Sequence, residues 1–340
     1  MFITSSSSYV LLNIGFDPTH QLPKIALNLM NENVPHLEPN IKLLVAKSRV
    51  FEDLAQIIEG KPDGYTAEVV CNVIDQIIKN NREGIEYALF SKLIIAIKRV
   101  LSVEHNKIKR VHLAALARFT VYGDDHQRAD LYGMDVLPTL VILLNHPDKT
   151  IVGDAVIAIN NIILGGARTT DSEKVHPYLQ TLDQEHLGAI EELFDIFTRS
   201  KDEPTKRNAA LAIGRLYRSL PLPQRYLPII SLLKQTSKSP EQNIAWNSIG
   251  TLGYLGVNEK NHPEILKDDY VTVLVDNLYD KPDGIIHFSL SLLQTLHKVG
   301  SVSTRQIIKR NVNIKRLKEL SEFKDEGVSS HAHAMLARLK

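Results

Sequence analysis

Histidine and carboxylate side chains are the first candidates for chemistry, because neutral imidazole and carboxylate groups bind metal ions. The chain offers Glu104-His105 and Glu185-His186, each in a turn-like segment. His331 and His333 lie two positions apart in an expected helix, so their side chains point to different faces. We therefore expect no metal site.

Nucleophile and phosphate-binding motifs give no stronger signal. Gly250, Gly253 and Gly256 are spaced three apart near the end of an expected helix, without the Gly-Lys-Ser/Thr sequence of a phosphate loop. We interpret them as sites of close helix packing. Cys71 lies in an apolar helical run, where a thiol is usually unreactive, and no Gly-x-Ser-x-Gly sequence occurs. The sequence predicts a protein that is not an enzyme and needs no small-molecule cofactor.

Composition narrows the class further. The 340 residues are 44% hydrophobic but only 6% aromatic, which favours an aliphatic, helical interior. A net charge of +1 argues against a whole-surface binder of nucleic acid. The single cysteine excludes an intramolecular disulfide, as is typical of the cytoplasm or nucleus. We expect no membrane span, and residues 1–16 lack a basic leader.

The stretch Gly133–Gly166 shows how the helices that position any site are built. Val136–Leu144 is apolar on nearly every side, and Asn145–Asp148 can stop one helix and cap the next. A second apolar stripe then recurs at helical spacing, through Ala155, Ile159, Ile162 and Ile163. The pattern predicts two helices joined by a turn, the second ending at Gly165-Gly166.

This stretch resembles the armadillo repeat. The first part of the motif is matched by Val136, Pro138, Leu140, Val141, Leu143 and Leu144. The second part is matched by Ala155, Ala158, Ile159, Asn161, Ile162 and Gly165. Ile157 stands where importin-like members carry a peptide-stacking tryptophan, which argues against an importin-type cargo mechanism.

The buried position of this unit recurs along the chain. Its equivalents are Ile77, Phe119, Ile162, Leu216, Leu252, Leu296 and Leu339. Most intervals are close to 40 residues, and a polar insertion at 167–185 explains the longest one. The expected fold is all-α, a right-handed α-α superhelix of the armadillo/HEAT-like solenoid type with about seven repeats. We expect two short amphipathic pieces, Tyr9–Phe16 and Pro23–Met30, to form an N-terminal cap within residues 1–38, and one repeat domain at 39–340.

Turns between the two helices of a unit support this register. Lys61–Gly64 and Lys281–Gly284 have the same sequence at equivalent places. Asp124-Asp125-His126 is interpreted as a polar loop between repeats. The charged helices of the last repeat, from Arg305 to Lys340, suit the end of a stack, which needs a polar outer face.

The resemblance implies that the last helix of each unit lines a concave groove and exposes positions four apart. The polar side chains expected there to contact a partner are Gln76, Arg110, Arg118, Asn161, Arg207, Arg215, Asn243, Asn247, Thr251 and Thr295. The apolar positions between them are expected to be buried: Ile74, Leu116, Ile159, Ile213, Ile249 and Leu293. The alternative is that the row is polar only because it faces water.

The resemblance also implies that Asn161 bonds the backbone of an extended peptide. An amide suits this role because it donates and accepts hydrogen bonds. Arginines at neighbouring positions would make the groove locally basic, and guanidinium groups pair carboxylates bidentately. An acidic peptide is therefore favoured over a basic nuclear-localisation signal.

Two other features have a simple structural interpretation. The segment 298–318 contains seven basic residues and no acidic one, and we interpret it as a solvated terminal face, with contact to phosphates or an anionic membrane as the alternative. Trp246 adjoins the row at Asn247 and is expected to pack at the edge of the core.

The favoured function is a non-enzymatic scaffold or adaptor in the cytoplasm or nucleus that binds a protein or peptide along the groove. One alternative is a HEAT-like enzyme or nucleic-acid-binding protein that uses the concave face. Another is a subunit whose convex face, or whose insertion at 167–185, is buried in a larger complex.

Overall fold

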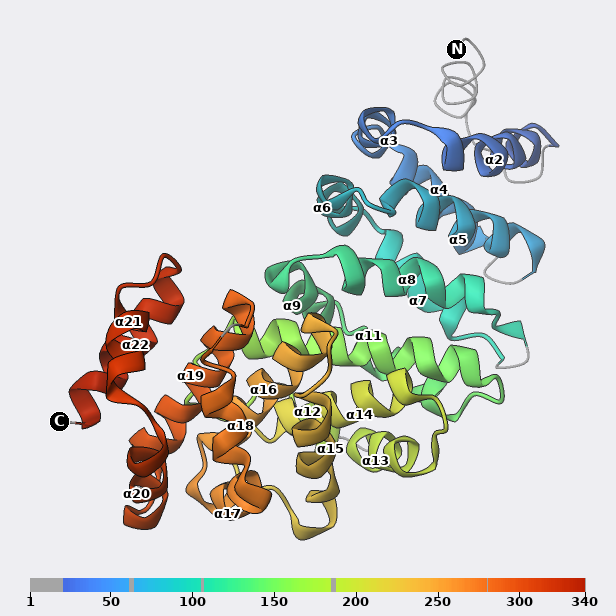
Figure 1. The fold of residues 1–340 in the computed structure, drawn as a ribbon. Coiled ribbons are helices and arrows are strands. Elements are labelled where there is room, and N and C mark those ends of the chain that lie inside the picture. Colours follow the sequence, from blue (N-terminus) through green and yellow to red (C-terminus); the bar gives the residue numbers. More distant parts are fainter. Residues whose placement is uncertain (1–20, 61–63, 105–106, 185–187, 280, 340) are drawn as a thin grey trace. The chain divides into compact units, whose positions relative to one another are not determined.

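The computed structural model describes residues 21–60, 64–104, 107–184, 188–279 and 281–339, which form helices and turns with no strand among them (Figure 1). The predictions on Tyr9–Phe16, on the turn at 61–63, on His105 and on Glu185-His186 lie outside these residues, as does the sequence before residue 21. Contacts group the chain into two compact units, residues 1–169 and 170–340, and each is described by itself. The expected single domain at 39–340 stays a prediction.

The first unit consists of stacked groups of three helices. After α2 (Gln21–Asn33), its helices are α3 (Pro39–Ala46), α4 (Val50–Gly60), α5 (Tyr65–Ile78), α6 (Arg82–Phe90), α7 (Leu93–Leu101), α8 (Arg110–Tyr122), α9 (Asp125–Gly133), α10 (Leu137–Ile142) and α11 (Lys149–Arg168). The third helices pack on one another in the order α5, α8, α11. The prediction of two helices per repeat is therefore wrong, because each of these groups has a third, short first helix.

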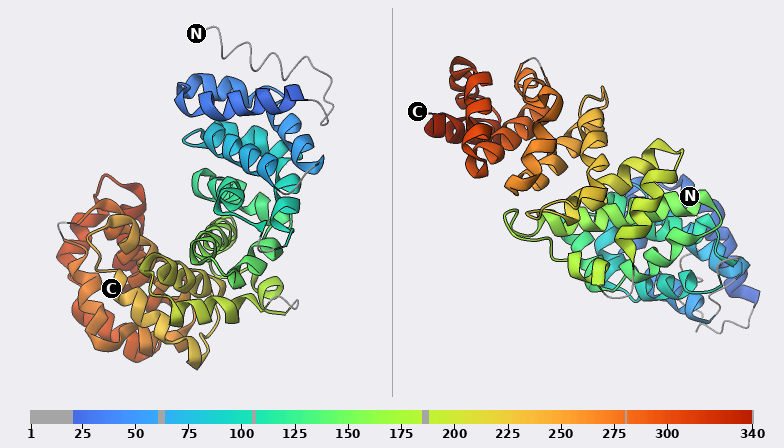
Figure 2. Two further views of the ribbon diagram at one scale, coloured as in Figure 1. Left: turned by 90° about the vertical axis from the view of Figure 1, so that its right-hand side faces the viewer. Right: turned by 90° about the horizontal axis from the view of Figure 1, so that it is seen from below.

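The second unit follows the same pattern, except that the group of α15 and α16 begins with a 3-10 helix, η4 (Gln224–Tyr226). Its helices are α12 (Leu179–Gln184), α13 (Ala189–Arg199), α14 (Glu203–Leu216), α15 (Pro228–Thr236), α16 (Gln242–Gly256), α17 (His262–Leu266), α18 (Tyr270–Asp276), α19 (Asp283–Val299), α20 (Val302–Asn311), α21 (Ile314–Ser321) and α22 (Glu326–Leu339). The last helices of its groups, α14, α16, α19 and α22, pack on one another in that order. Figure 2 shows these helices from two further sides.

The core follows the repeat register read from the sequence. All seven equivalent positions, from Ile77 to Leu339, are buried. The six apolar positions between the polar ones of the row are buried as well, for example Ile159 in α11 and Leu293 in α19. The all-α solenoid architecture with about seven repeats is confirmed.

The short helix α9 is set by capping rather than by an apolar stripe. Asp124, expected in a loop, caps α9 by accepting a hydrogen bond from the Gln127 backbone N–H at 2.9 Å, and the Asp124 backbone N–H donates one to the Gln127 side-chain oxygen at 3.0 Å. Only Leu131 in α9 is buried. The interpretation of residues 124–126 as a loop is wrong, because polar capping starts a helix there.

Helix α11 continues through Gly165-Gly166 and ends at Arg168, so the predicted end is also wrong. A Cβ at Gly165 would lie 2.5 Å from the Arg128 Cβ and 2.8 Å from the Asp125 carbonyl oxygen. Glycine at 165 therefore permits α9 to approach α11 closely. By length and composition α11 could span a membrane, but most of its side chains are buried in the protein interior, as in the core helix of a repeat.

Candidate functional site

The ten residues predicted to contact a partner all lie on six helices, α5, α8, α11, α14, α16 and α19. We call these ten residues the third-helix row. Eight of them are exposed or half-exposed, as the register predicts. Arg215 and Thr251 are each only 1% exposed, so their predicted role as surface contacts is corrected. The row is thus largely, but not wholly, a polar surface.

Ion pairs connect successive third helices of the first unit. The Lys109 ammonium, just before α8, lies 2.6 Å from the Glu68 carboxylate on α5. Further along, the Arg118 guanidinium on α8 pairs with Asp75 on α5. The Arg110 guanidinium donates two bonds to Asp154 on α11, at 2.6 and 3.1 Å.

This pairing changes the predicted electrostatics of the row. Arg118 was expected to make the groove basic, yet its charge is opposed by the Asp75 carboxylate, which is 9% exposed. Arg110 is likewise held in a bidentate geometry by Asp154. These hydrogen bonds raise the pKa of both guanidinium groups. The expectation of a locally basic groove in the first unit is therefore corrected, because carboxylates of adjacent repeats neutralise these arginines.

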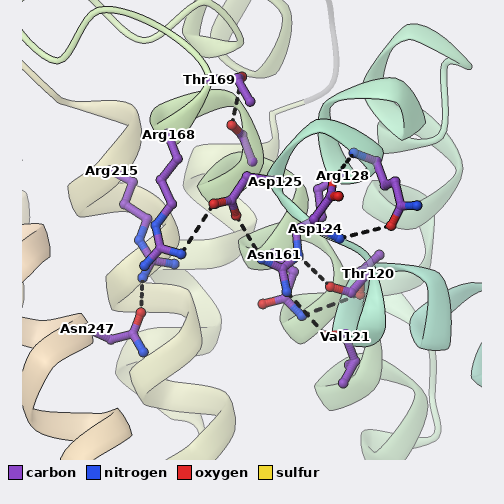
Figure 3. A network of polar contacts seen from close by, with 12 residues as sticks. Thr120, Val121, Asp124, Asp125, Arg128, Asn161, Arg168, Thr169, Arg215 and Asn247 are labelled. Atoms are coloured by element: carbon purple, nitrogen blue, oxygen red, sulfur yellow. Dashed lines mark hydrogen bonds and ion pairs between the residues drawn. The ribbon is translucent and has the colours of Figure 1, made fainter. Parts of the chain in front are cut away.

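Asn161 lies beside a polar network at the junction of α8, α9 and α11 (Figure 3). Its amide nitrogen is 3.4 Å from the Thr120 hydroxyl, a long contact that leaves most of its hydrogen-bonding capacity unused. The Arg128 guanidinium bonds the Thr120 and Val121 carbonyl oxygens at 2.7 and 3.2 Å. It also pairs with Asp125 at 2.9 Å. The side chain of Asn161 is therefore half-exposed on a rigid support.

In the second unit the row is tied together by amide and hydroxyl groups. The buried Arg215 guanidinium donates to the Asn247 side-chain oxygen at 2.7 Å (Figure 3). The Asn247 amide donates to the Asn243 carbonyl at 2.7 Å. The Thr251 hydroxyl donates to the Asn247 carbonyl at 2.8 Å. Burial of Arg215 and Thr251 follows from these internal bonds, whereas the side chain of Asn243 stays exposed.

Sequence reasoning did not identify the ion pairs that three carboxylates form along the row, namely those of Glu68, Asp75 and Asp154. Their partners Lys109, Arg118 and Arg110 stand 41, 43 and 44 residues away. A search for opposite charges one repeat length apart would have found them, because stacked repeats bring equivalent helices side by side.

Other candidate residues serve packing. Burial raises the pKa of the Cys71 thiol to about 12, so it stays protonated at neutral pH. A Cβ on Gly250 or Gly256 would lie 3.2–3.4 Å from side chains of α19, as close packing predicts, but Gly253 has nothing within 4 Å and departs from that prediction. Trp246 packs against Gly284 at the core edge.

The histidines do not gather into a metal site within the described residues, where no group of three or more histidine, cysteine or carboxylate side chains could hold an ion. His331 faces His287, with ring centroids 4.9 Å apart, while His333 is exposed on another side of α22. This confirms that His331 and His333 point to different faces.

Stacked groups of helices, with a polar row on the last helix of each group, give this chain an armadillo-type α-solenoid fold. No family model matches the chain, and no curated protein matches it in sequence. An engineered protein of known crystal structure is similar, with a TM-score of 0.68, 15% identity, and coverage of 98% of this chain and 77% of that one. A designed armadillo repeat protein in complex with the peptide (KR)4 has a TM-score of 0.53 and 18% identity, covering 74% of this chain and 100% of that one. These likenesses show the fold.

Proposed function

We propose that the chain is a non-enzymatic scaffold that binds a segment of another polypeptide on its third-helix row. The observation that carries the proposal is that the row contains two kinds of polar group, those paired within the protein and those exposed to solvent. Most charged groups of the row form ion pairs or hydrogen bonds with side chains of the adjacent repeat. Exposed or half-exposed amide and hydroxyl groups are presented by Gln76, Asn161, Asn243 and Thr295. Such groups suit the alternating donors and acceptors of a peptide backbone.

Rigidity of the row supports the same function. The ion pairs of Asp75 and Asp154 fix the spacing of α5, α8 and α11 before any partner arrives. A preformed surface loses little conformational entropy on binding, although the partner segment must still be ordered. The designed armadillo protein with a bound peptide shows that a fold of this type accommodates such a ligand.

Site-specific photo-cross-linking tests the proposal in the full chain. A photoreactive amino acid at Asn161 in the first unit, or at Asn243 in the second, is expected to capture a partner polypeptide. Gln56 on α4 and Gln235 on α15 are exposed positions off the row and provide matched controls. Recovery of adducts from the controls but not from the row would overturn the proposal.

Side-chain removal supplies a second readout. Gln76→Ala with Asn161→Ala, and Asn243→Ala with Thr295→Val, should weaken capture of the same partner without changing helical circular dichroism. Replacement of Gln56 and Gln235 by alanine should leave capture unchanged. Equal recovery by all of these variants would exclude the row as the binding surface.

A further inference from the structure

Three cationic side chains lie on the helices that pack against the helix of one histidine at the end of the second unit. Arg305 and Lys309 lie four residues apart on α20, so they share a face of that helix. Arg338 lies in the last turn of α22. Both helices pack on α19, whose last turn contains His297 (Figure 1). We call Arg305, Lys309, Arg338 and His297 the C-terminal basic cluster.

The positive charges of this cluster act on His297. Burial lowers the pKa of His297, and the positive charges of Arg305, Arg338 and Lys309 lower it further. Within the described part of the chain, none of the three forms an ion pair or a side-chain hydrogen bond, and all are exposed. Arg316, on the neighbouring helix α21, is by contrast bonded to the Leu278 carbonyl and to Glu319.

The position of Arg305 makes the arrangement electrostatically unfavourable by itself. It lies near the N-terminus of α20, where Ser301 caps the helix and the helix dipole is positive. A cation at this end is disfavoured. Attraction to the negative C-terminal end of the helix dipole can explain Lys309, in the last turn, but it cannot explain Arg305.

A carboxylate already lies at the edge of the cluster. The Lys298 ammonium, adjacent to His297, pairs with Glu173, which stands 125 residues earlier in the chain. Glu173 belongs to the irregular segment 169–178 that precedes α12. Within the molecule itself, an acidic side chain on a non-helical segment thus already binds a cation next to this cluster.

Other anionic partners fit the surface less well. Single-stranded nucleic acid is held by exposed aromatic rings as well as by cations, and the basic cluster contains no aromatic ring apart from the imidazole. A membrane surface requires a continuous apolar face. The exposed apolar residues of α20, Val302 and Ile307, are five positions apart and thus about 140° apart around the helix.

We propose that the C-terminal basic cluster binds an acidic segment of a partner polypeptide. The carboxylates pair with the guanidinium groups of Arg305 and Arg338 and with the ammonium of Lys309, next to the Lys298–Glu173 pair. This inference rests on the proposed function, because it assigns a charge and a second contact surface to the same partner polypeptide. It also assigns the binding of acidic side chains to the last repeat, whereas the sequence predicted that the third-helix row binds them.

Fluorescence anisotropy on the full chain tests the inference. The probes are a labelled peptide of glutamate and glycine, a lysine–glycine peptide of equal length, labelled oligouridylate, and vesicles that contain phosphatidylserine. The glutamate peptide should bind, and Arg305→Glu with Lys309→Glu should weaken it about tenfold or more. The doubly substituted protein should in turn gain affinity for the lysine peptide.

Lys238→Glu with Lys260→Glu is the matched control, since both lysines are exposed, lie outside the cluster and change the net charge equally. Equal loss in the control would show unspecific attraction and overturn the inference, as would preference for oligouridylate or vesicles, or no binding of the glutamate peptide. Glutamate at 305 favours the N-terminal end of α20 whereas glutamate at 309 is unfavourable at its C-terminal end, so helical circular dichroism checks that the variant folds. Arg305→Gln with Lys309→Gln checks the result without charge reversal.

The same variant separates this inference from the proposed function. A partner that cross-links to Asn161 or Asn243 should bind Arg305→Glu/Lys309→Glu more weakly than the wild type. Undiminished binding would overturn the basic cluster as its acidic docking site while leaving the third-helix row in place. If the row residues gave no cross-links while the glutamate peptide still bound the wild type, the third-helix row would be overturned and the basic cluster would stand.

Discussion

The Arg218 guanidinium donates a hydrogen bond to the Lys174 carbonyl oxygen at 2.8 Å, although the two residues stand 44 positions apart. It also bonds the Thr170 hydroxyl at 3.0 Å and the Val175 carbonyl at 3.3 Å. Arg218 is fully buried. The described part of the polar insertion is therefore held against the end of α14.

Replacement of Arg218 by alanine should release this segment. The loss of several hydrogen bonds from a charged donor should lower the free energy of unfolding by about 2–4 kcal/mol. Limited proteolysis should then cut within residues 169–178, whereas the wild type should resist there. Arg225→Ala, which removes an exposed ion pair with Glu191, is the control. Cleavage of the wild type at the same rate would contradict the role of Arg218.

Glycine-to-alanine substitutions at two helical sites should have opposite effects. Gly165→Ala places a methyl group 2.5 Å from the Arg128 Cβ, so α9 must move away from α11 and stability should fall. Gly253→Ala in α16 meets nothing within 4 Å and should stabilise by about 0.5–1 kcal/mol through helix propensity. Thermal unfolding followed by circular dichroism measures both, and a neutral Gly165→Ala would refute the close-packing interpretation.

The Asp75–Arg118 pair should show a measurable coupling energy. Asp75 is nearly buried while Arg118 is one-third exposed, so the pair is only partly screened by solvent. A double-mutant cycle with Asp75→Asn and Arg118→Gln should give a coupling of about 1 kcal/mol in urea unfolding. The exposed pair Arg199–Asp195 should give less. Additive effects at Asp75 and Arg118 would indicate that the pair does not stabilise the repeat interface.

Acidification should destabilise the second unit through two facing histidines. Burial lowers the pKa of both His287 on α19 and His331 on α22; the positive charge of His287 lowers the pKa of His331 further, while Asp325 partly opposes the shift at His287. The unfolded chain, with a histidine pKa near 6.5, therefore binds more protons than the folded chain just below that pH. Stability is complete above about pH 6.5 and decreases as the pH falls towards the folded values.

Urea unfolding at neutral pH and in mild acid measures this loss. His331→Gln should reduce the pH dependence, because it removes a group whose pKa is lowered in the folded chain. His333→Gln, on an exposed face of the same helix, should leave it unchanged. Identical pH profiles for the wild type and His331→Gln would argue against coupling between the rings.

The sequence predicted the repeat length and the buried stripe because both depend on local spacing. The equivalents of Ile162 could be followed through the chain, and all are buried. The short helix α9 could not be found in the same way, since Leu131 is its only buried residue and its N-terminus is fixed by the polar cap of Asp124.

The candidate site was less predictable, because its character depends on contacts between repeats. Arg118 and Arg215 look alike in sequence, yet one pairs with Asp75 and the other is buried against Asn247. Which charge faces which depends on the stacking of neighbouring helices, and no local pattern encodes it. The groups that remain available, such as Asn161 and Asn243, emerge only once these internal pairs are known.

The ion pairs of the first unit also specify which repeat follows which. Asp75 on α5 meets Arg118 on α8, whereas α11 presents Asn161 at the corresponding position. An amide would leave the nearly buried carboxylate of Asp75 without a compensating charge. Exchanging two repeats, or stacking a repeat on the same repeat of another copy of the chain, would therefore leave unpaired charges at the interface. These ion pairs thus favour the native order of the repeats.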